Sequence, residues 1–277
     1  MSGFSPQWLD LREPADHRAR NAKLAHRLAQ HFDGWRPVTV IDLGCGTGSN
    51  LRATAPLLGA EQQWTLVDYE QSLLDAAVGR LSAWADAAAE REGGLELFKG
   101  AKRISVTFRR ADLARNLDDA LGEGANLITA SALFDLASKA FIETFVRAAV
   151  ARRAAFYTVL TYDGDQRWTP QHEADAAMLA AFHAHQSNDK GFGPAAGPDA
   201  PDLLGEAFQA AGYTVLEGDS AWRLGAGEYA LIAELAAGFA QAARETGMVD
   251  AAAIDSWAGV VRTGAVVGHT DTLALPG

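Results

Sequence analysis

The chain of 277 residues lacks most of the features that mark secreted and membrane proteins. It contains one cysteine, Cys45, so neither an internal disulfide framework nor a multi-cysteine zinc or iron–sulfur site can form. The first residues lack the basic and then apolar order of a signal peptide. No stretch approaches the ~20 uncharged apolar residues that a membrane span needs. We therefore expect a soluble, cytoplasmic protein.

Positive charge is scarce as well. The chain has 24 Lys and Arg residues against 35 Asp and Glu residues, which gives a net charge of −11. A protein needs a basic surface for a long-lived electrostatic attraction to nucleic acid or to an anionic membrane, so we expect neither partner. Apolar residues make up 48% of the chain and charged residues 21%, which is sufficient for a sizeable core.

Strand-like and helical segments alternate along the chain, which indicates an α/β fold with a mostly parallel sheet covered by helices. The expected strands are residues 38–43, 64–67, 104–108, 125–130, 155–162, 213–217 and 265–274. The expected helices are residues 16–32, 49–58, 71–92, 141–153, 170–186, 202–211, 227–246 and 250–263. The regular alternation breaks over residues 163–201, a turn-rich stretch typical of a lid or binding loop.

The most informative segment runs from Val40 to Gly48, with the sequence VIDLGCGTG. A buried strand is followed by three alternating glycines and the start of a helix. Such glycines allow a sharp turn and let a ligand lie against bare backbone at a helix N-terminus. The dinucleotide-binding pattern G-x-G-x-x-G would need a glycine where Ser49 stands. A nicotinamide cofactor and a cofactor without phosphate therefore remain alternatives at this loop.

Asp42, Gly44, Gly46 and Gly48 match the acid-x-G-x-G-x-G motif of class I S-adenosylmethionine-dependent methyltransferases, which the chain resembles over residues 38–162. The resemblance implies a doubly wound, Rossmann-like sheet of seven strands with the last one antiparallel. It also implies S-adenosylmethionine as cofactor and S-adenosylhomocysteine as product. We expect a single domain over residues 1–277, with an N-terminal helical cover (1–36), an inserted helical cap (163–201) and a helical insertion (227–263).

Further cofactor contacts follow from the strand ends. Asp68 ends the second expected strand, where a carboxylate can accept both hydrogen bonds from a ribose diol. The resemblance implies that Asp112 holds the adenine amino group, that Leu113 packs on the ring, and that Arg18 or Arg20 binds the methionyl carboxylate. The complete expected set is Arg18, Arg20, Asp42, Gly44, Gly46, Gly48, Asp68, Tyr69, Asp112, Leu113, Ala130 and Ser131.

The acceptor side is less clearly marked. Candidate catalytic residues are His185, whose ordinary pKa suits a general base, together with Asp135 and Tyr162. A capping role for Asp135 and structural roles for the histidines are the alternatives. The candidate substrate residues are Trp168, Lys190, Phe192, Trp222 and Arg223. We expect no metal site, because His183 and His185 are two positions apart and would point in different directions on a helix.

The sequence thus predicts an enzyme that transfers a methyl group from S-adenosylmethionine to an O, N or C atom of a small molecule held under a helical cap. The expected assembly is a monomer or homodimer. Residues 131–134 read SALF where nucleic-acid amino-methyltransferases carry an Asn or Asp, two prolines and an aromatic residue, so nucleic acid is disfavoured as substrate. A protein methyltransferase, a non-catalytic S-adenosylmethionine-binding module and a nicotinamide-dinucleotide enzyme remain alternatives.

Overall fold

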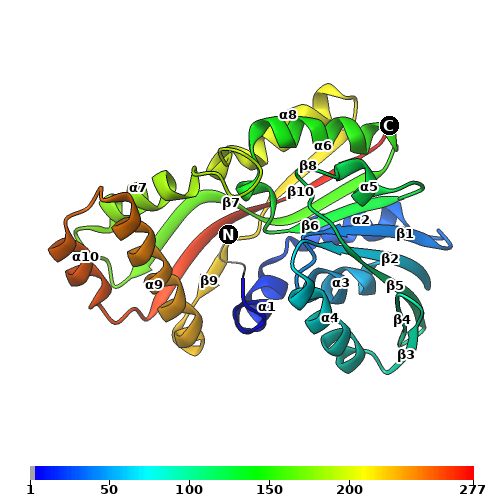
Figure 1. Ribbon diagram of the computed structural model, residues 1–277, viewed down its shortest axis with the longest axis horizontal. Helices are drawn as coiled ribbons and strands as arrows, with labels where there is room; N and C mark the ends of the chain where they lie inside the picture. The colour runs from blue at the N-terminus through cyan, green and yellow to red at the C-terminus, as the bar shows by residue number, and fades with distance from the viewer. Residues whose placement is uncertain (1–3) are drawn as a thin grey trace.

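The computed structural model describes residues 4–277, which fold around one twisted sheet (Figure 1). The described residues form ten strands in the order β3-β4-β5-β2-β1-β6-β7-β10-β8, with β9 paired to β10. Strands β5, β2, β1, β6 and β7 are parallel, and β10 is antiparallel to each strand it pairs with. The predicted doubly wound, mostly parallel sheet with an antiparallel last strand is confirmed, but with ten strands in place of seven.

The elements have the following bounds. The strands are β1 (Val38–Leu43), β2 (Glu61–Asp68), β3 (Ala87–Arg91), β4 (Gly94–Lys99), β5 (Lys102–Arg110), β6 (Leu127–Ser131), β7 (Ala155–Thr169), β8 (Thr214–Asp219), β9 (Trp222–Leu224) and β10 (Gly264–Leu275). The helices are α1 (Pro6–Ala19), α2 (Ala22–His31), α3 (Ser49–Thr54), α4 (Gln71–Trp84), α5 (Leu117–Leu121), α6 (Lys139–Ala151), α7 (Asp175–Gln186), α8 (Ala200–Ala210), α9 (Tyr229–Thr246) and α10 (Ala251–Ala258). Short 3-10 turns are η1 (Ala55–Leu57), η2 (Phe134–Leu136), η3 (Gly197–Asp199) and η4 (Ala226–Glu228).

Both faces of the central sheet are covered, which explains the continuous apolar runs in the inner strands. On β1, Val38 and Val40 pack with α2, α3 and α4, whereas Ile41 and Leu43 pack with α5, α6 and α8. This sandwich leaves the carboxyl ends of the parallel strands as one edge of the sheet, where open α/β sheets bind their ligands.

Strands β7 and β10 continue beyond the central sheet into a second group of helices, on the left in Figure 1. Strand β6 pairs with β7 only as far as Val159, whereas β10 accompanies β7 to Thr169. Helices α7, α9 and α10 pack on this extension, and Phe182 of α7 stacks on Phe239 of α9 with ring centroids 4.0 Å apart. We call this part of the molecule the helical lobe: residues 160–186, 222–258 and 264–269.

Several predicted elements were wrong in their extent: the helices predicted over residues 170–186 and 250–263 span only Asp175–Gln186 and Ala251–Ala258, and three other elements differ because of tertiary contacts. The helix predicted over residues 16–32 is two helices, since the chain turns at Asn21, whose backbone N–H donates to Asp271 of β10 at 2.8 Å. The helix predicted over residues 71–92 ends at Trp84, and its alanine-rich end forms β3 of a hairpin with β4. Residues 163–169, predicted to be irregular, belong to β7. In each case a tertiary pairing overrides local propensity.

Candidate cofactor and acceptor site

The glycine loop between β1 and α3 has a backbone shape that only glycine adopts without cost. Gly44, Gly46 and Gly48 have φ angles of +61°, +53° and +78°, in the left-handed region. The loop is tied to β2, because the backbone N–H of Cys45 donates to the carbonyl oxygen of Val67 at 3.0 Å. Burial raises the pKa of the Cys45 thiol, as expected for a side chain that packs in the loop and does no nucleophilic chemistry.

Asp68 at the end of β2 holds this loop in place. Its Oδ2 accepts from the backbone N–H of Gly46 at 2.8 Å and its Oδ1 from that of Glu70 at 2.9 Å. Burial raises the pKa of Asp68, while these backbone donors act in the opposite direction. Each oxygen keeps a second lone pair, so the carboxylate can still accept hydrogen bonds from a diol.

Asp42 lies beneath the loop and is fully buried. Its Oδ1 accepts from Asn50 Nδ2 at 2.6 Å, whereas its Oδ2 has no hydrogen-bond partner among residues 4–277. Desolvation by burial raises the pKa of Asp42 to about 7. Arg20 joins the same network through Asn50 Oδ1 at 2.7 Å and Thr54 Oγ1 at 2.9 Å. Arg20 therefore fastens the junction of α1 and α2 to α3, and its contact with a cofactor stays a prediction.

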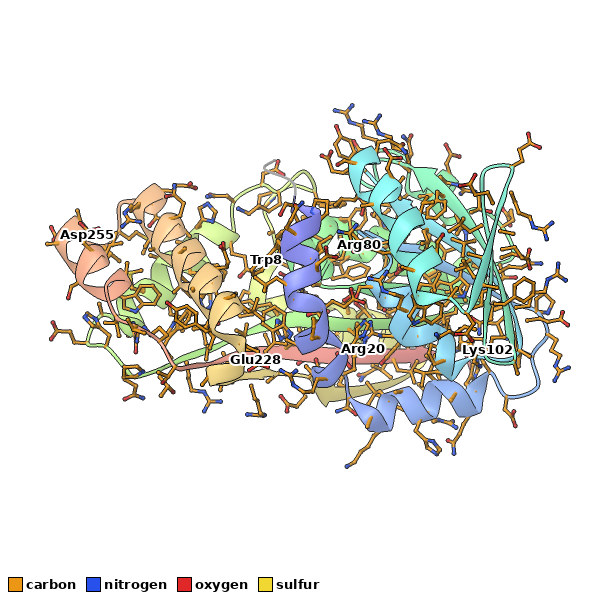
Figure 2. All side chains as sticks on the ribbon, turned by 90° about the horizontal axis from the view of Figure 1, so that it is seen from below. Trp8, Arg20, Arg80, Lys102, Glu228 and Asp255 are labelled. Atoms are coloured by element: carbon orange, nitrogen blue, oxygen red, sulfur yellow. The ribbon has the colours of Figure 1, made fainter. Side chains whose placement is uncertain are left out.

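Helix α1 lies directly over the glycine loop, between α4 and α9 (Figure 2). A Cβ atom placed on Gly46 would stand 2.9 Å from Cδ1 of Leu9. Three ion pairs tie α1 to its surroundings: Asp10 with Arg80 of α4, Glu13 with Arg52 of α3, and Arg18 with Glu228 of η4. Arg18 is thus engaged at the exposed end of α1, and its predicted cofactor role is likewise untested.

The other expected cofactor residues gather at the same edge of the sheet. Asp112 and Leu113 follow β5, Tyr69 follows β2, and Ala130 and Ser131 end β6 beside β1. Leu113 is buried, while the Tyr69 ring is 45% exposed with the Arg110 guanidinium 5.8 Å from its centroid. Asp112 Oδ1 accepts from the backbone N–H of Ala114 at 3.0 Å. The structure therefore brings together residues that are up to 62 positions apart in the sequence, from Tyr69 to Ser131.

Asp135 lies in η2, just after β6, and is the candidate catalytic residue that lies nearest the loop. Leu133, two residues earlier, would contact a Cβ atom on Gly44 at 3.2 Å. Asp135 Oδ2 accepts from Gln186 Nε2 at 3.2 Å, and desolvation by burial raises the pKa of Asp135 to about 6. Tyr162 faces the same region, since the charge of the Asp135 carboxylate adds to the effect of burial in raising the pKa of Tyr162.

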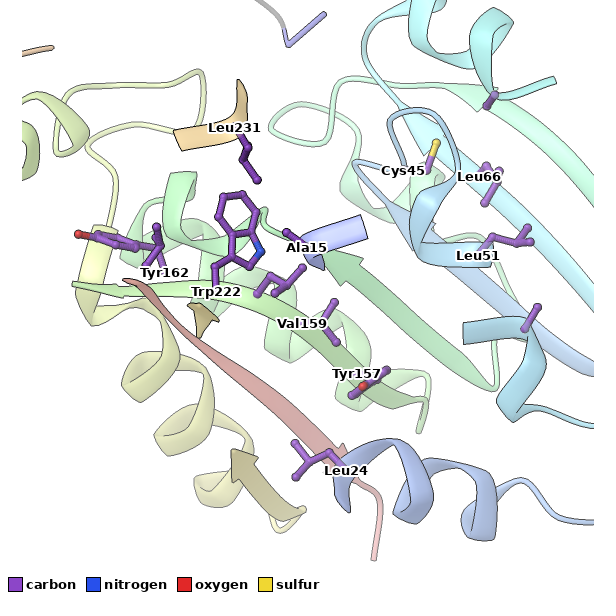
Figure 3. Packing of buried hydrophobic residues seen from close by; sticks show 14 of the residues in the cluster. Ala15, Leu24, Cys45, Leu51, Leu66, Tyr157, Val159, Tyr162, Trp222 and Leu231 are labelled. Atoms are coloured by element: carbon purple, nitrogen blue, oxygen red, sulfur yellow. The ribbon is translucent and has the colours of Figure 1, made fainter. Parts of the chain in front are cut away.

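Tyr162 and Trp222 line the side of this region that borders the helical lobe. Figure 3 shows Trp222 of β9 between Ala15 of α1 and Leu231 of α9, while Tyr162 lies on β7, which pairs with β10 as β9 does. Trp222 Nε1 donates to Asp16 Oδ1 at 3.1 Å. The Tyr162 hydroxyl lies 3.0 Å from His183 Nε2, and burial raises the pKa of the tyrosine and lowers that of the histidine. The hydroxyl therefore keeps its proton at neutral pH.

The remaining acceptor-side candidates are engaged elsewhere in the structure. His185 pairs with Glu245 of α9 at 2.8 Å, and Lys190 Nζ donates to the His185 carbonyl oxygen at 3.2 Å. Trp168 packs edge-on against Phe239 and Trp257 in the core of the helical lobe. Phe192 packs against Phe141, and Arg223 pairs with Asp219 at the surface. The structure does not place these five side chains around Asp135, and their catalytic or substrate roles stay predictions.

Sequence reasoning missed four side chains that surround the Asp135 region: Arg12, Asp16, Gln186 and His269. Arg12 was overlooked because the helix was expected to begin at residue 16, although Ser5 followed by Pro6 is a helix-start signal. Ser5 Oγ indeed accepts from the backbone N–H of Trp8 at 3.1 Å. No local signal identifies Gln186 or His269, because the packing of α7 brings Gln186 here and the pairing of β10 with β7 brings His269 here.

Within residues 4–277, no group of three His, Cys, Asp or Glu side chains is arranged to hold a metal ion. No helix of this part of the chain combines the length and the apolar character needed to cross a membrane.

Comparisons with known proteins bear on the fold. No protein-family model and no curated protein sequence matches the chain. The solved YcgJ protein of Bacillus subtilis is 13% identical, with a TM-score of 0.52 over 93% of this chain and 100% of that one. A candidate methyltransferase of Bacillus halodurans is 12% identical, with a TM-score of 0.51 over 92% and 100%. The cyclopropane synthase MmaA2 of Mycobacterium tuberculosis is 13% identical, with a TM-score of 0.51 over 98% and 94%.

At these identities the likeness concerns the arrangement of the backbone, and it agrees with the strand order and the glycine loop described above. The chain therefore has the Rossmann-like fold of the class I S-adenosylmethionine-dependent methyltransferases.

Proposed function

We propose that this protein is an enzyme that transfers a methyl group from S-adenosylmethionine to a small-molecule acceptor. The proposal rests on two features that lie at the same edge of the sheet. A glycine loop with three left-handed residues is held by Asp68, and Asp135 lies beside it with a carboxylate oxygen that has no hydrogen-bond partner within residues 4–277. The first suits a nucleoside cofactor, and the second offers an acceptor site next to it.

The residues at the sheet edge fit the parts of the cofactor. Asp68 would accept from the ribose hydroxyls, and the bare backbone of Gly44 and Gly46 would lie against the methionyl part. Asp112, Leu113 and Tyr69 would border the adenine. Because Leu9 of α1 already touches Gly46, the cofactor would displace this side chain and lie beneath α1.

When bound, S-adenosylmethionine supplies a sulfonium methyl group that is electrophilic without further activation. The protein then has to hold an acceptor atom in line with that group and to keep water away, which is worth several powers of ten in rate. Helix α1 and the aromatic side chains Trp222 and Tyr162 exclude water, since Asp135, Tyr162 and Trp222 are all buried. Asp135 can hold a proton of the acceptor at its free oxygen.

A small molecule fits this site better than a macromolecule. The net charge of −11 opposes nucleic acid, and the side chains around Asp135 are enclosed by α1, α7 and β10. We therefore expect no nucleic-acid partner. A cytoplasmic location and a monomeric or homodimeric state belong to the same proposal.

The cofactor part is tested by calorimetric titration of the protein with S-adenosylhomocysteine and, separately, with NAD. We expect binding of S-adenosylhomocysteine alone, and a loss of at least tenfold in affinity in Asp68→Ala. Asp118→Ala is the matched control, because the Asp118 carboxylate is 84% exposed. Thermal melting of both variants shows whether they are folded. Binding of NAD in preference to S-adenosylhomocysteine would contradict the proposal.

The acceptor part is tested by incubating the protein with methyl-labelled S-adenosylmethionine and a fractionated cell extract. We expect the label in the low-molecular-mass fraction. Label found only in protein would favour a protein methyltransferase, and binding without transfer to any fraction would favour a non-catalytic cofactor-binding module.

A further inference from the structure

Two acceptor oxygens in the Asp135 region have no hydrogen-bond partner in the described part of the chain: Asp135 Oδ1 and Gln186 Oε1. Both residues are more than nine-tenths buried, with 8% and 6% of their surface exposed. They are neighbours, because Gln186 Nε2 donates to Asp135 Oδ2 at 3.2 Å. This contact also fixes the orientation of the amide, since the carboxylate would repel Oε1 in that place.

A buried acceptor that lacks a donor costs the folded state roughly 1–3 kcal/mol. Two such oxygens on side chains that are hydrogen-bonded to each other indicate a site that is completed by a ligand. Since both are acceptors, the ligand must present at least two hydrogen-bond donors. An ammonium group has up to three donors, whereas an alcohol has one and an ionised carboxylate has none.

The charges around the two oxygens also favour a cation. Arg12, whose charge lowers the pKa of Asp135, is committed to Asp16 through Nε at 2.9 Å and Nη2 at 3.2 Å. His269 is neutral, because desolvation by burial lowers its pKa to about 3. Among residues 4–277, this leaves the Asp135 carboxylate without a paired positive charge. Asp163 and Asp165, which act on Tyr162 together with Asp135, add charge of the same sign.

The position of Asp135 and Gln186 connects these two side chains with the proposed methyl transfer. Leu133 contacts the glycine loop at Gly44, and Asp135 follows two residues later in η2. Trp222 supplies an aromatic wall on the other side, with the Arg12 guanidinium 5.0 Å from its ring centroid. A group that is held by Asp135 and Gln186 therefore lies beside the loop that would hold the cofactor.

From this arrangement, and resting on the proposed function, we infer that the methyl acceptor is a primary or secondary amine whose N–H groups donate to Asp135 Oδ1 and Gln186 Oε1. The amine arrives as an ammonium ion and gives one proton to the Asp135 carboxylate. Its freed lone pair then forms the N–C bond as the S–C bond of the cofactor breaks. The electrons of the S–C bond stay on the sulfur of S-adenosylhomocysteine, the positive charge moves to the methylated nitrogen, and Asp135 returns its proton to water.

Burial supports the proton-accepting role, because it raises the pKa of Asp135 to about 6 and so makes the carboxylate a better base than an exposed aspartate. Gln186 is a positioning residue in this scheme, since it both holds the carboxylate and offers the second oxygen.

The test is a calorimetric titration of the protein saturated with S-adenosylhomocysteine. The probes are propylamine, phenethylamine and tryptamine, each with the alcohol and the carboxylate of the same carbon skeleton. We expect at least one amine to bind at least tenfold more tightly than its alcohol and its carboxylate. This preference should fall at least tenfold in Asp135→Asn, which keeps the shape of the side chain and removes its charge.

Asp165→Asn is the matched control, because it removes the same charge from the same region, but from a partly exposed carboxylate that is paired with Arg167. It should keep the preference for the amine, and both variants should bind S-adenosylhomocysteine as the wild type does. Alcohols that bind as tightly as amines, or a preference that survives in Asp135→Asn, would overturn the inference and leave the proposed function standing. Failure of the wild type to bind S-adenosylhomocysteine would overturn both.

Discussion

The buried carboxyl of Asp42 makes the stability of this protein depend on pH in a direction that can be stated beforehand. The side chain is fully buried, and desolvation raises its pKa from 3.8 to about 7. Between these two values the folded protein binds a proton that the unfolded chain has released. The free energy of unfolding therefore falls as the pH rises through this range and becomes level above about pH 7.

The size of the effect follows from the two pKa values. Since a pKa difference of one is worth about 1.4 kcal/mol, ionised Asp42 costs the folded state about 4 kcal/mol above about pH 7. About 3 kcal/mol of this cost develops between about pH 5 and about pH 8. The neighbouring Asn50 amide and the Arg20 guanidinium already reduce the cost, while Asp68 adds to it.

The perturbation is Asp42→Asn, which cannot ionise and can still accept from Asn50 Nδ2. The assay is urea unfolding of wild type and variant at about pH 5 and about pH 8, without cofactor. The new amide nitrogen has no acceptor among the described residues, which costs the variant roughly 1–3 kcal/mol at either pH. The informative quantity is therefore the change in the difference between the two proteins, which should move by about 3 kcal/mol in favour of the variant at the higher pH.

Other carboxyls with raised pKa values, such as Asp135 and Asp271, also change the stability with pH. Their contributions cancel when the free energy of unfolding of the wild type is subtracted from that of the variant, because both proteins contain them. Asp118→Asn, at a largely exposed carboxylate, is the control and should show no such movement. An equal stability difference between wild type and Asp42→Asn at both pH values would refute the reasoning. It would mean that Asp42 is ionised in the folded protein throughout this pH range.

Two further predictions concern the loop and the helical lobe. Gly46→Ala should lower stability by about 1–2 kcal/mol, the cost of the left-handed backbone, and should weaken S-adenosylhomocysteine binding at least tenfold, because the methyl group would stand on the bare backbone against which the methionyl part would lie. Gly93→Ala, also left-handed but with open space around it, should show the stability loss in urea unfolding with unchanged binding in calorimetry; equal binding by both variants would contradict a role for Gly46 at the cofactor. Phe239→Ala should lose about 3–5 kcal/mol of stability in the same unfolding assay, because a buried stacked ring is removed. Tyr229→Ala, 60% exposed, should lose less than about 0.5 kcal/mol, and a similar loss in both would show that the stacked ring adds nothing.

Much of the expected cofactor site is determined by local sequence, because the glycine loop and its flanking strand and helix are contiguous in the chain. A buried strand, three alternating glycines and a helix start occupy one short run at residues 40–48, and their backbone angles follow from the absence of side chains. Strand ends can likewise be read from apolar runs. Because the carboxyl ends of parallel strands share one edge, Asp68 and Asp112 could be placed near the loop before the structure was known.

The positions of the residues around Asp135 were decided by tertiary structure alone. Gln186 meets Asp135 across 51 positions, and Trp222 meets Asp16 across 206. These contacts depend on the antiparallel pairing of β10 with β7 and on the position of α1 over the loop. The same pairing turned residues 163–169 into strand, and the hairpin with β4 turned an alanine-rich helix end into β3. Local propensity differs by less than about 1 kcal/mol per residue between such states, so the sequence alone could not select among them, whereas burial and strand pairing could.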